Sequence, residues 1–147
     1  GICLGWFRVF YAYGPRQRKE SLIPIVIDNL TKGRLPKLKT PNNYNDYIFV
    51  QDIADIFSIS VTKDFPSGVY NIGSGHKTSV LEVCEIAESI ALNQSSLSSQ
   101  LQKDSIEVPV ESSFYASTKL TEEIFSWKAK TSLRDGIEIT YKNIDHD

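Results

Sequence analysis

The 147-residue chain contains no methionine and only two cysteines and two histidines. The cysteines, Cys3 and Cys84, are too far apart for a metal-binding or redox spacing, so we expect two reduced thiols in a cytoplasmic protein. No apolar run approaches the roughly 18 residues of a membrane span, and nothing resembles a signal peptide. The sequence therefore argues against a disulfide scaffold, a Cys/His metal centre and a membrane partner.

The chain also lacks a strong excess of positive or negative charge, since its formal net charge is -2. Proteins that bind nucleic acid usually carry clusters of Lys and Arg, but the richest basic run in this chain, residues 16–19, is short. We interpret that run as a solvated loop and expect no nucleic-acid partner. The chain contains no methionine that could serve as an initiator, and it begins with an apolar strand. From these two observations together we expect the chain to be a piece of a longer protein.

Strand-like and helix-like segments alternate along the chain, which predicts an α/β fold with a largely parallel sheet. Ser79 and Glu82 form a capping box ahead of a helical stripe that contains Cys84, so this thiol is expected in the core. Strands are expected at residues 7–12, 35–39, 47–50, 69–72 and 106–110, and helices at 22–32, 51–63 and 80–91, then after Ser117 and after Ser132.

Residues 7–17 read as a strand, buried on both faces, that ends abruptly at Gly14 and Pro15. Ligands in open α/β sheets sit outside the carboxyl ends of strands, so this segment is a candidate site wall. An ordinary strand-to-loop turn is an equally good interpretation of these residues alone.

Three other motifs are better explained as turns or helix starts than as ligand-binding or catalytic sites. Gly73-Ser74-Gly75 follows a strand, but it fits neither the dinucleotide fingerprint nor the P-loop, and we interpret it as a structural turn. Asp46 and Asp52 are interpreted as helix-start carboxylates, and His76 has no second ligand at a metal spacing. The residues contain no complete catalytic set, and no catalytic or metal-binding residue is assigned.

Three ordered segments resemble the NAD-dependent epimerase/dehydratase family of extended short-chain dehydrogenases, which act on nucleotide sugars. Residues 7–17 resemble its Leu-Arg-x-Phe-Asn-x-Tyr-Gly-Pro-x-Gln, and residues 45–54 resemble its Arg-Asp-Phe-Ile-Tyr-Val-Asp-Asp-Val-Ala. Residues 69–75 resemble its Tyr-Asn-Ile-Gly-x-Gly, and 127–136 its closing Trp-x-Pro-x-x-x-Leu-x-x-Gly. The resemblance implies the C-terminal half of such a protein.

The resemblance also implies site residues. Phe10 matches a residue lining the nicotinamide, and Tyr13 lies on the same loop, so both are expected at NAD (or NADP). The implied contacts with a nucleotide-sugar substrate are Tyr11, Ser21, Leu22, Leu38, Lys39 and Asn45. Two positions depart from the family: Tyr11 replaces an Asn at the diphosphate, and Asn45 replaces an Arg that holds a phosphate. Arg grips phosphate through charge-assisted bidentate bonds, so altered nucleotide handling, with a CDP- or dTDP-linked sugar, is the hypothesis.

The implied architecture is the last part of a doubly wound, Rossmann-type parallel sheet plus a small α/β substrate-binding domain. Residues 1–17 and 46–75 resemble the cofactor domain, and residues 18–45 and 76–147 resemble mostly the substrate domain. The family's Gly-rich cofactor turn and Tyr-x-x-x-Lys pair precede the opening strand, so the chain alone is expected to lack both and to be inactive. The implied reaction, in partnership with the missing N-terminal half, is epimerisation, dehydration or reduction at the sugar C4 through a 4-keto species. The alternative is a non-catalytic nucleotide-sugar or protein-binding relic, and a homodimer is a further possibility.

Overall fold

The computed structural model describes residues 3–93 and 113–144, and it confirms an α/β fold with parallel strands. The expected strand at 106–110 lies outside the described residues. None of the helices in the described ranges is long and apolar enough to cross a membrane. The elements are β1 (Gly5–Val9), β2 (Tyr11–Tyr13), α1 (Leu22–Thr31), β3 (Tyr44–Asn45), β4 (Tyr47–Phe49), α2 (Val50–Ser60), β5 (Gly68–Ile72), β6 (Thr78–Ser79), α3 (Val80–Ala91), α5 (Lys119–Phe125) and α6 (Leu133–Lys142).

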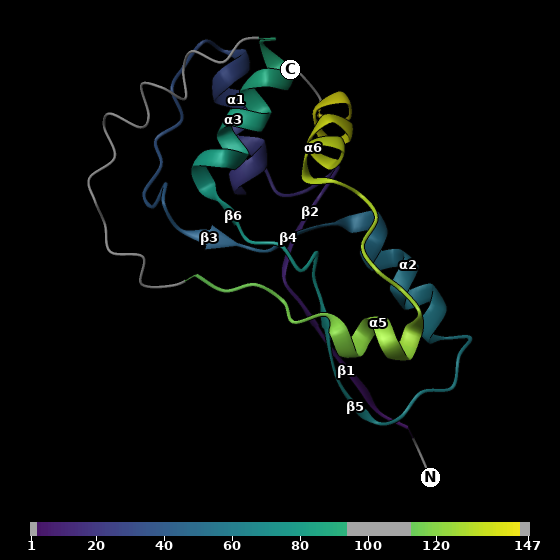
Figure 1. Ribbon diagram of the computed structural model, residues 1–147. Coiled ribbons are helices and arrows are strands. Elements are labelled where there is room, and N and C mark those ends of the chain that lie inside the picture. Colours follow the sequence, from purple (N-terminus) through teal and green to yellow (C-terminus); the bar gives the residue numbers. More distant parts are fainter. Residues whose placement is uncertain (1–2, 94–112, 145–147) are drawn as a thin grey trace.

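The strands form three pairs (Figure 1): β1 and β5 are parallel, β2 and β4 are parallel, and β3 and β6 are antiparallel. The single strand expected at residues 7–12 is wrong, because the chain changes partner at Phe10. The Phe10 N–H donates to the Ile72 carbonyl at 2.9 Å, and the next N–H, of Tyr11, donates to the Asp46 carbonyl at 2.9 Å. Burial on both faces is also wrong, since Val9 on β1 is 40% exposed and Tyr11 on β2 is 39% exposed.

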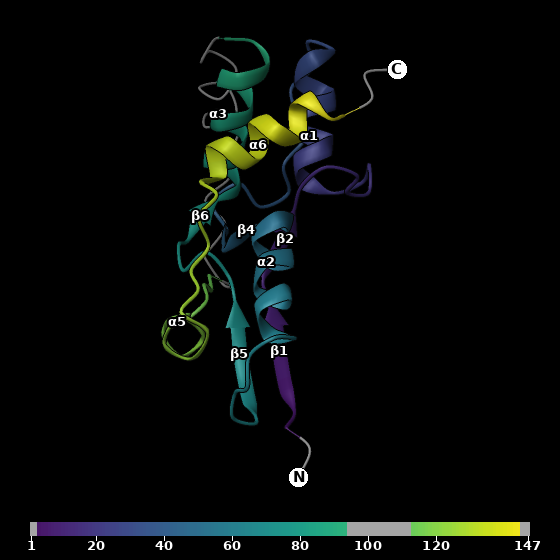
Figure 2. The same cartoon turned by 90° about the vertical axis from the view of Figure 1, so that its right-hand side faces the viewer.

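Two hydrophobic clusters lie at opposite ends of the molecule. The first is aromatic: the Phe7 ring on β1 lies with its centroid 5.2–6.1 Å from the rings of Phe57, Phe65, Tyr70 and Phe125. Phe57 belongs to α2 and Phe125 to α5, so both helices cover the same face of the β1–β5 pair. Figure 2 shows these strands extending away from the helices at the other end.

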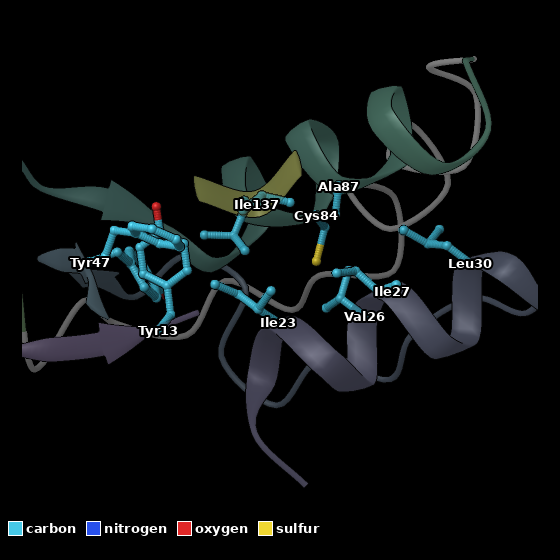
Figure 3. Close-up of a cluster of buried hydrophobic side chains, with 11 residues drawn as sticks. Tyr13, Ile23, Val26, Ile27, Leu30, Tyr47, Cys84, Ala87 and Ile137 are labelled. Atoms are coloured by element: carbon cyan, nitrogen blue, oxygen red, sulfur yellow. The ribbon is translucent and has the colours of Figure 1, made fainter. Parts of the chain in front are cut away.

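The second cluster joins α1, α3 and α6 (Figure 3). The apolar stripe of α1 (Ile23, Val26, Ile27 and Leu30) is at most 1% exposed. Cys84 points from α3 toward α1, which confirms its place in the core. Each fully buried aliphatic side chain stabilises the fold by about 1.5–3 kcal/mol, so this interface holds α1 firmly against α3.

The helix ends show which of the predicted capping residues form a capping hydrogen bond. Ser79 and Ser132 cap α3 and α6, accepting hydrogen bonds from the backbone N–H groups of Glu82 and Asp135, both at 3.1 Å. Ser21 precedes α1 without a side-chain capping bond. α2 ends at Ser60, earlier than expected, and α5 follows Thr118 in place of Ser117. Residues 35–39 form no strand, because no other described strand pairs with them.

Candidate functional site

The structure brings two of the sequence-predicted substrate residues together around Tyr47. Tyr11 on β2 is in register with Tyr47 on β4, and their ring centroids are 5.0 Å apart. The Asn45 side-chain amide donates to the Tyr47 hydroxyl at 3.3 Å. Tyr47 is buried, whereas Tyr11 is 39% exposed. We call Tyr11, Asn45 and Tyr47 the tyrosine–amide cluster.

Phe10 precedes Tyr11 in the chain and has different neighbours. It is half-buried, and its ring centroid lies 6.0 Å from that of Phe114, in the segment that leads into α5. The Asp46 carboxylate accepts a hydrogen bond from the N–H of Ala116 at 2.9 Å, so this segment is tied to the start of β4. Sequence reasoning missed Phe114, because the signal is a contact between distant parts of the chain.

Tyr13, expected at the cofactor, has its side chain in the hydrophobic core. It is 2% exposed, its ring packs edge-on against Phe49, and its hydroxyl donates to the Leu133 carbonyl at 3.4 Å. Burial raises the pKa of the Tyr13 phenol far above its usual value. The side chain therefore holds β2 to α6 in this structure.

The other four predicted substrate residues lie apart from the cluster. Leu22 and Leu38 pack against the α1–α3–α6 core, Ser21 is half-buried before α1, and Lys39 is exposed. Within residues 3–93 and 113–144, no hydrogen bond or ring contact joins these four to Tyr11 or Asn45.

The Gly73-Ser74-Gly75 turn is occupied by a side chain of the protein itself. The buried Asp46 carboxylate accepts bonds from the Ser74 N–H and hydroxyl, both at 2.7 Å, and from the Gly75 N–H at 2.9 Å. The N–H groups that would cradle a phosphate are thus already satisfied, which confirms the structural interpretation of the turn. Asp46 is therefore an internal anchor rather than a helix-start carboxylate.

Asp52 has a similar long-range role, which sequence reasoning also missed. Its buried carboxylate accepts from the N–H groups of Lys130 and Thr131, both at 3.1 Å. The two aspartates fix two walls of a pocket of about 350 Å³. It is lined by Tyr47, Ser74, His76, Thr78 and residues 129–133.

A second hollow, of about 220 Å³, lies at the strand-to-loop turn that the sequence singled out. Residues 12–17 and Val50 line it. Gly14 has a φ of 153°, and a Cβ there would press into the Val50 side chain. Arg16 adopts a φ of 64°, a left-handed conformation that is uncommon outside glycine. The backbone conformations of Gly14 and Arg16 therefore set the shape of this turn, and the turn forms one wall of a small, mainly apolar hollow.

The expectation that the chain lacks a Tyr-x-x-x-Lys spacing overlooks Tyr115 and Lys119. Tyr115 precedes α5 and is 58% exposed, while Lys119 is the first residue of α5 and pairs with Glu123 at 3.9 Å. Because Tyr115 lies outside the helix, the two do not share one helical face.

Two buried groups near the cluster, the Tyr47 phenol and the Cys84 thiol, have raised pKa values. Burial raises the pKa of the Tyr47 phenol to about 12, and burial raises that of the Cys84 thiol to about 12. Across the described part of the chain, no group of three His, Cys, Asp or Glu side chains could hold a metal ion. The contacts of Tyr47 within the cluster are a ring contact with Tyr11 and a hydrogen bond from the Asn45 amide.

Comparison with known proteins gives the family context. The model of the NAD dependent epimerase/dehydratase family matches residues 1–73. The low-salt glycan biosynthesis protein Agl12 of Haloferax volcanii is 30% identical over 132 residues, which cover 86% of this chain and 40% of that protein. The chain spans between 11% and 40% of the length of the curated relatives it matches.

Solved structures show the same fold. The dTDP-glucose 4,6-dehydratase of Bacillus anthracis, in complex with NAD, aligns with a TM-score of 0.78 and 24% identity, over 95% of this chain and 43% of that one. The UDP-glucose 4-epimerase of Thermotoga maritima, with UDP-glucose, aligns with a TM-score of 0.73 and 22% identity, over 95% and 45%. These relatives bind NAD and nucleotide sugars.

One expectation is corrected by these matches. The chain was expected to be the C-terminal half of such a protein, and this is wrong. The family model matches residues 1–73, where β1 and β2 open the parallel pairings, and the aligned part of the relatives is their Rossmann half. Taken with the parallel strands, these matches show that the chain is a distant relative of the NAD-dependent nucleotide-sugar epimerases and dehydratases.

Proposed function

We propose that the chain provides nucleotide-sugar and NAD(P) contacts for an epimerase, dehydratase or reductase. In the proposed reaction, the hydrogen on the sugar C4 leaves as hydride to the nicotinamide of the oxidised cofactor. The proton of the 4-hydroxyl passes to a base, which leaves a 4-keto sugar and reduced cofactor. No residue of the described part is assigned as that base. Residues 1–17 and 46–75 are proposed to serve the cofactor and the remainder mostly the substrate.

One observation carries the proposal. Phe10, Tyr11 and Asn45 gather where the chain passes from the β1–β5 pair to the β2–β4 pair. Phe10 is hydrogen-bonded to β5, and Tyr11 to the residue after Asn45. We propose that Phe10 faces the cofactor and Tyr11, the next residue in the chain, faces the substrate at this transition between the two strand pairs. Hydride transfer requires this proximity of cofactor and sugar.

Isothermal titration calorimetry with dTDP-glucose, UDP-glucose and NAD tests the proposal. We expect a nucleotide sugar to bind, and Tyr11→Ala to weaken that binding about tenfold, in line with the loss of one stacked ring. Gln51→Ala is the control, because Gln51 is exposed on α2 and its amide bonds only to Asp55 among the described residues. Absence of binding by both nucleotide sugars would contradict the proposal.

A non-catalytic binding module is the second candidate. It is favoured by the burial of Tyr13, Tyr47 and Cys84, which raises their pKa values, whereas an activated base or nucleophile among them would need a lowered pKa. Mass spectrometry after incubation with NAD and dTDP-glucose distinguishes the two. A 4-keto product supports the enzyme and contradicts the module.

A further inference from the structure

The Phe10 and Phe114 rings come from distant parts of the chain and lie against each other. Their centroids are 6.0 Å apart, and their planes are tilted by 53°. Phe10 is half-buried, whereas Phe114 is 57% exposed, so more than half of the Phe114 side chain stays open. Because Phe10 faces the cofactor in the proposed function, Phe114 extends the same aromatic wall.

The position of Phe114 is set two residues further along the chain, at Ala116. Ala116 is 2% exposed, and its N–H donates to the Asp46 carboxylate at 2.9 Å. Within residues 3–93 and 113–144, Phe114 makes no hydrogen bond of its own, and its ring contacts only the Phe10 ring. The bond from Ala116 to Asp46 is therefore the nearest described attachment of the segment that carries Phe114.

Asp46 is attached to both proposed contact regions through different atoms. Its carboxylate, in a residue that is 1% exposed, also accepts from the N–H groups of Ser74 and Gly75, at 2.7 and 2.9 Å. Its backbone carbonyl accepts from the Tyr11 N–H at 2.9 Å. The carboxylate thus holds the segment of Phe114, and the carbonyl holds β2 at Tyr11. A side-chain substitution at position 46 affects the first attachment and retains the second.

Gly73 leaves the space that this arrangement requires. A Cβ at position 73 would lie 2.5 Å from the Ala116 Cβ and 2.7 Å from the Asp46 Oδ2 atom. Both separations are too short for atoms in contact, so a larger residue at 73 would displace the segment of Ala116 or the carboxylate. Gly73 and Asp46 therefore both determine how closely this segment approaches Phe10.

We infer that Asp46 is a positioning residue for the cofactor: through Ala116 it holds the Phe114 ring against Phe10, and the pair of rings faces the nicotinamide. The inference rests on the proposed function, because it takes Phe10 as a cofactor contact. An aromatic wall that is already in place lowers the cost of ordering side chains when the ligand binds. The substrate contact at Tyr11 depends on the Asp46 carbonyl and not on its carboxylate.

Asp46→Asn separates these two roles. An amide has one acceptor oxygen in place of two, and its NH₂ group would face backbone donors. We expect the nuclear Overhauser effect between the Phe10 and Phe114 rings to weaken, and the NAD affinity measured by calorimetry to fall about tenfold. The dTDP-glucose affinity should stay within about threefold of that of the unmodified chain. A merely structural role would weaken both affinities or neither.

Asp52→Asn is the matched control. Asp52 is also a buried carboxylate that accepts from two backbone N–H groups, but these belong to the segment before α6 and not to that of Phe114. It should lower stability and leave both affinities unchanged. Circular dichroism melting curves identify a temperature at which each variant is folded.

Gly73→Ala tests the same contact with the carboxylate intact, and it replaces Asp46→Asn if that variant does not fold. It should weaken the ring contact and NAD binding, and spare dTDP-glucose binding. Gly68→Ala on the same strand is its control, because a Cβ there would come no closer than 3.4 Å to its neighbours. Unchanged NAD affinity in folded Gly73→Ala counts against the inference.

A double-mutant cycle tests whether Asp46 acts through Phe114. Phe114→Ala should lower NAD affinity about tenfold, and adding Asp46→Asn should lower it no further. Trp6→Ala, at a similarly exposed aromatic on β1, should have no effect. Additive losses overturn the inference. An unchanged ring contact or an unchanged NAD affinity in folded Asp46→Asn also overturns it.

The unmodified chain distinguishes failure of the inference from failure of the proposed function. Absence of binding by both dTDP-glucose and UDP-glucose contradicts the proposed function itself. If a nucleotide sugar binds and NAD does not, the inference is overturned and the proposed substrate contacts stand. Equal losses of NAD and dTDP-glucose affinity in Asp46→Asn also overturn only the inference.

Discussion

Gly136 of α6 lies directly against the phenol of Tyr13 on β2, and a Cβ at position 136 would overlap the tyrosine hydroxyl. We therefore expect Gly136→Ala to lower the free energy of unfolding by about 1–3 kcal/mol, the usual cost of overpacking a core. Urea unfolding measures the change. In a Tyr13→Phe background the penalty should shrink, because the hydroxyl is gone. An equal penalty in both backgrounds would show that the hydroxyl is not the obstacle.

Asp46→Asn is expected to destabilise the fold by about 2–3 kcal/mol, because an amide cannot accept the four hydrogen bonds that the buried carboxylate accepts. The new NH₂ group would also face backbone N–H donors. Thermal and urea unfolding measure the loss. Asp64→Asn, at an exposed loop position, is the matched control and should be neutral. A neutral Asp46→Asn variant would contradict the anchoring role.

The three serines that precede helices should respond differently to alanine. Ser79→Ala and Ser132→Ala each remove a capping bond to the N–H three residues later, at an expected cost of about 1 kcal/mol. Ser21→Ala should cost much less, because the Ser21 side chain makes no capping bond. Urea unfolding of the three variants checks this order. A Ser21→Ala loss as large as the other two would contradict the described cap geometry.

Stability should fall at alkaline pH. Burial raises the pKa of Cys84 to about 12 from 9.0 and that of Tyr47 to about 12 from 10.0, so the unfolded chain loses these protons first. Their contribution to stability is complete below pH about 9 and is lost as pH rises toward about 12. Unfolding free energies measured across this range should decline less steeply in Tyr47→Phe. The same slope in both proteins would show that Tyr47 does not contribute.

The two thiols should differ in reactivity. Cys3 is exposed, whereas Cys84 is 1% exposed in the α1–α3 interface and its raised pKa keeps it protonated. A chromogenic disulfide reagent should therefore titrate one thiol rapidly in the folded protein and two in urea. In Cys3→Ser the rapid phase should vanish. Rapid modification of Cys84 in that variant would contradict a closed interface.

Sequence reasoning succeeded where a structural signal is complete within a few residues. The capping serine, the acidic residue three positions later and the apolar stripe together specify α3, and the same pattern specifies α6. The α1 stripe is likewise readable, because helical spacing alone places Ile23, Val26, Ile27 and Leu30 on one face. Residues within each of these helices, or directly before it, are therefore sufficient to predict the helix.

The features that were predicted wrongly depend on contacts with residues far along the chain. Residues 7–12 have the composition of one strand, but Phe10 bonds to Ile72 and Tyr11 to Asp46, so the pairing divides them. Residues 35–39 look extended, yet no described strand pairs with them. The candidate site also depends on distant contacts. Tyr11 and Asn45 both contact Tyr47. Tyr13, which the sequence places on the same loop as Tyr11, instead packs against α6, where Gly136 leaves space for its ring.

The anchoring of Asp52 also has a consequence for the order in which the chain folds. Its carboxylate is buried, yet its backbone donors lie 78 and 79 residues further along. While the protein is being synthesised, α2 leaves the ribosome long before those donors exist. Docking α2 at that stage would bury a carboxyl group without its hydrogen-bond donors, which is unfavourable. We therefore expect the first half of the chain to close only after the segment before α6 has emerged from the ribosome.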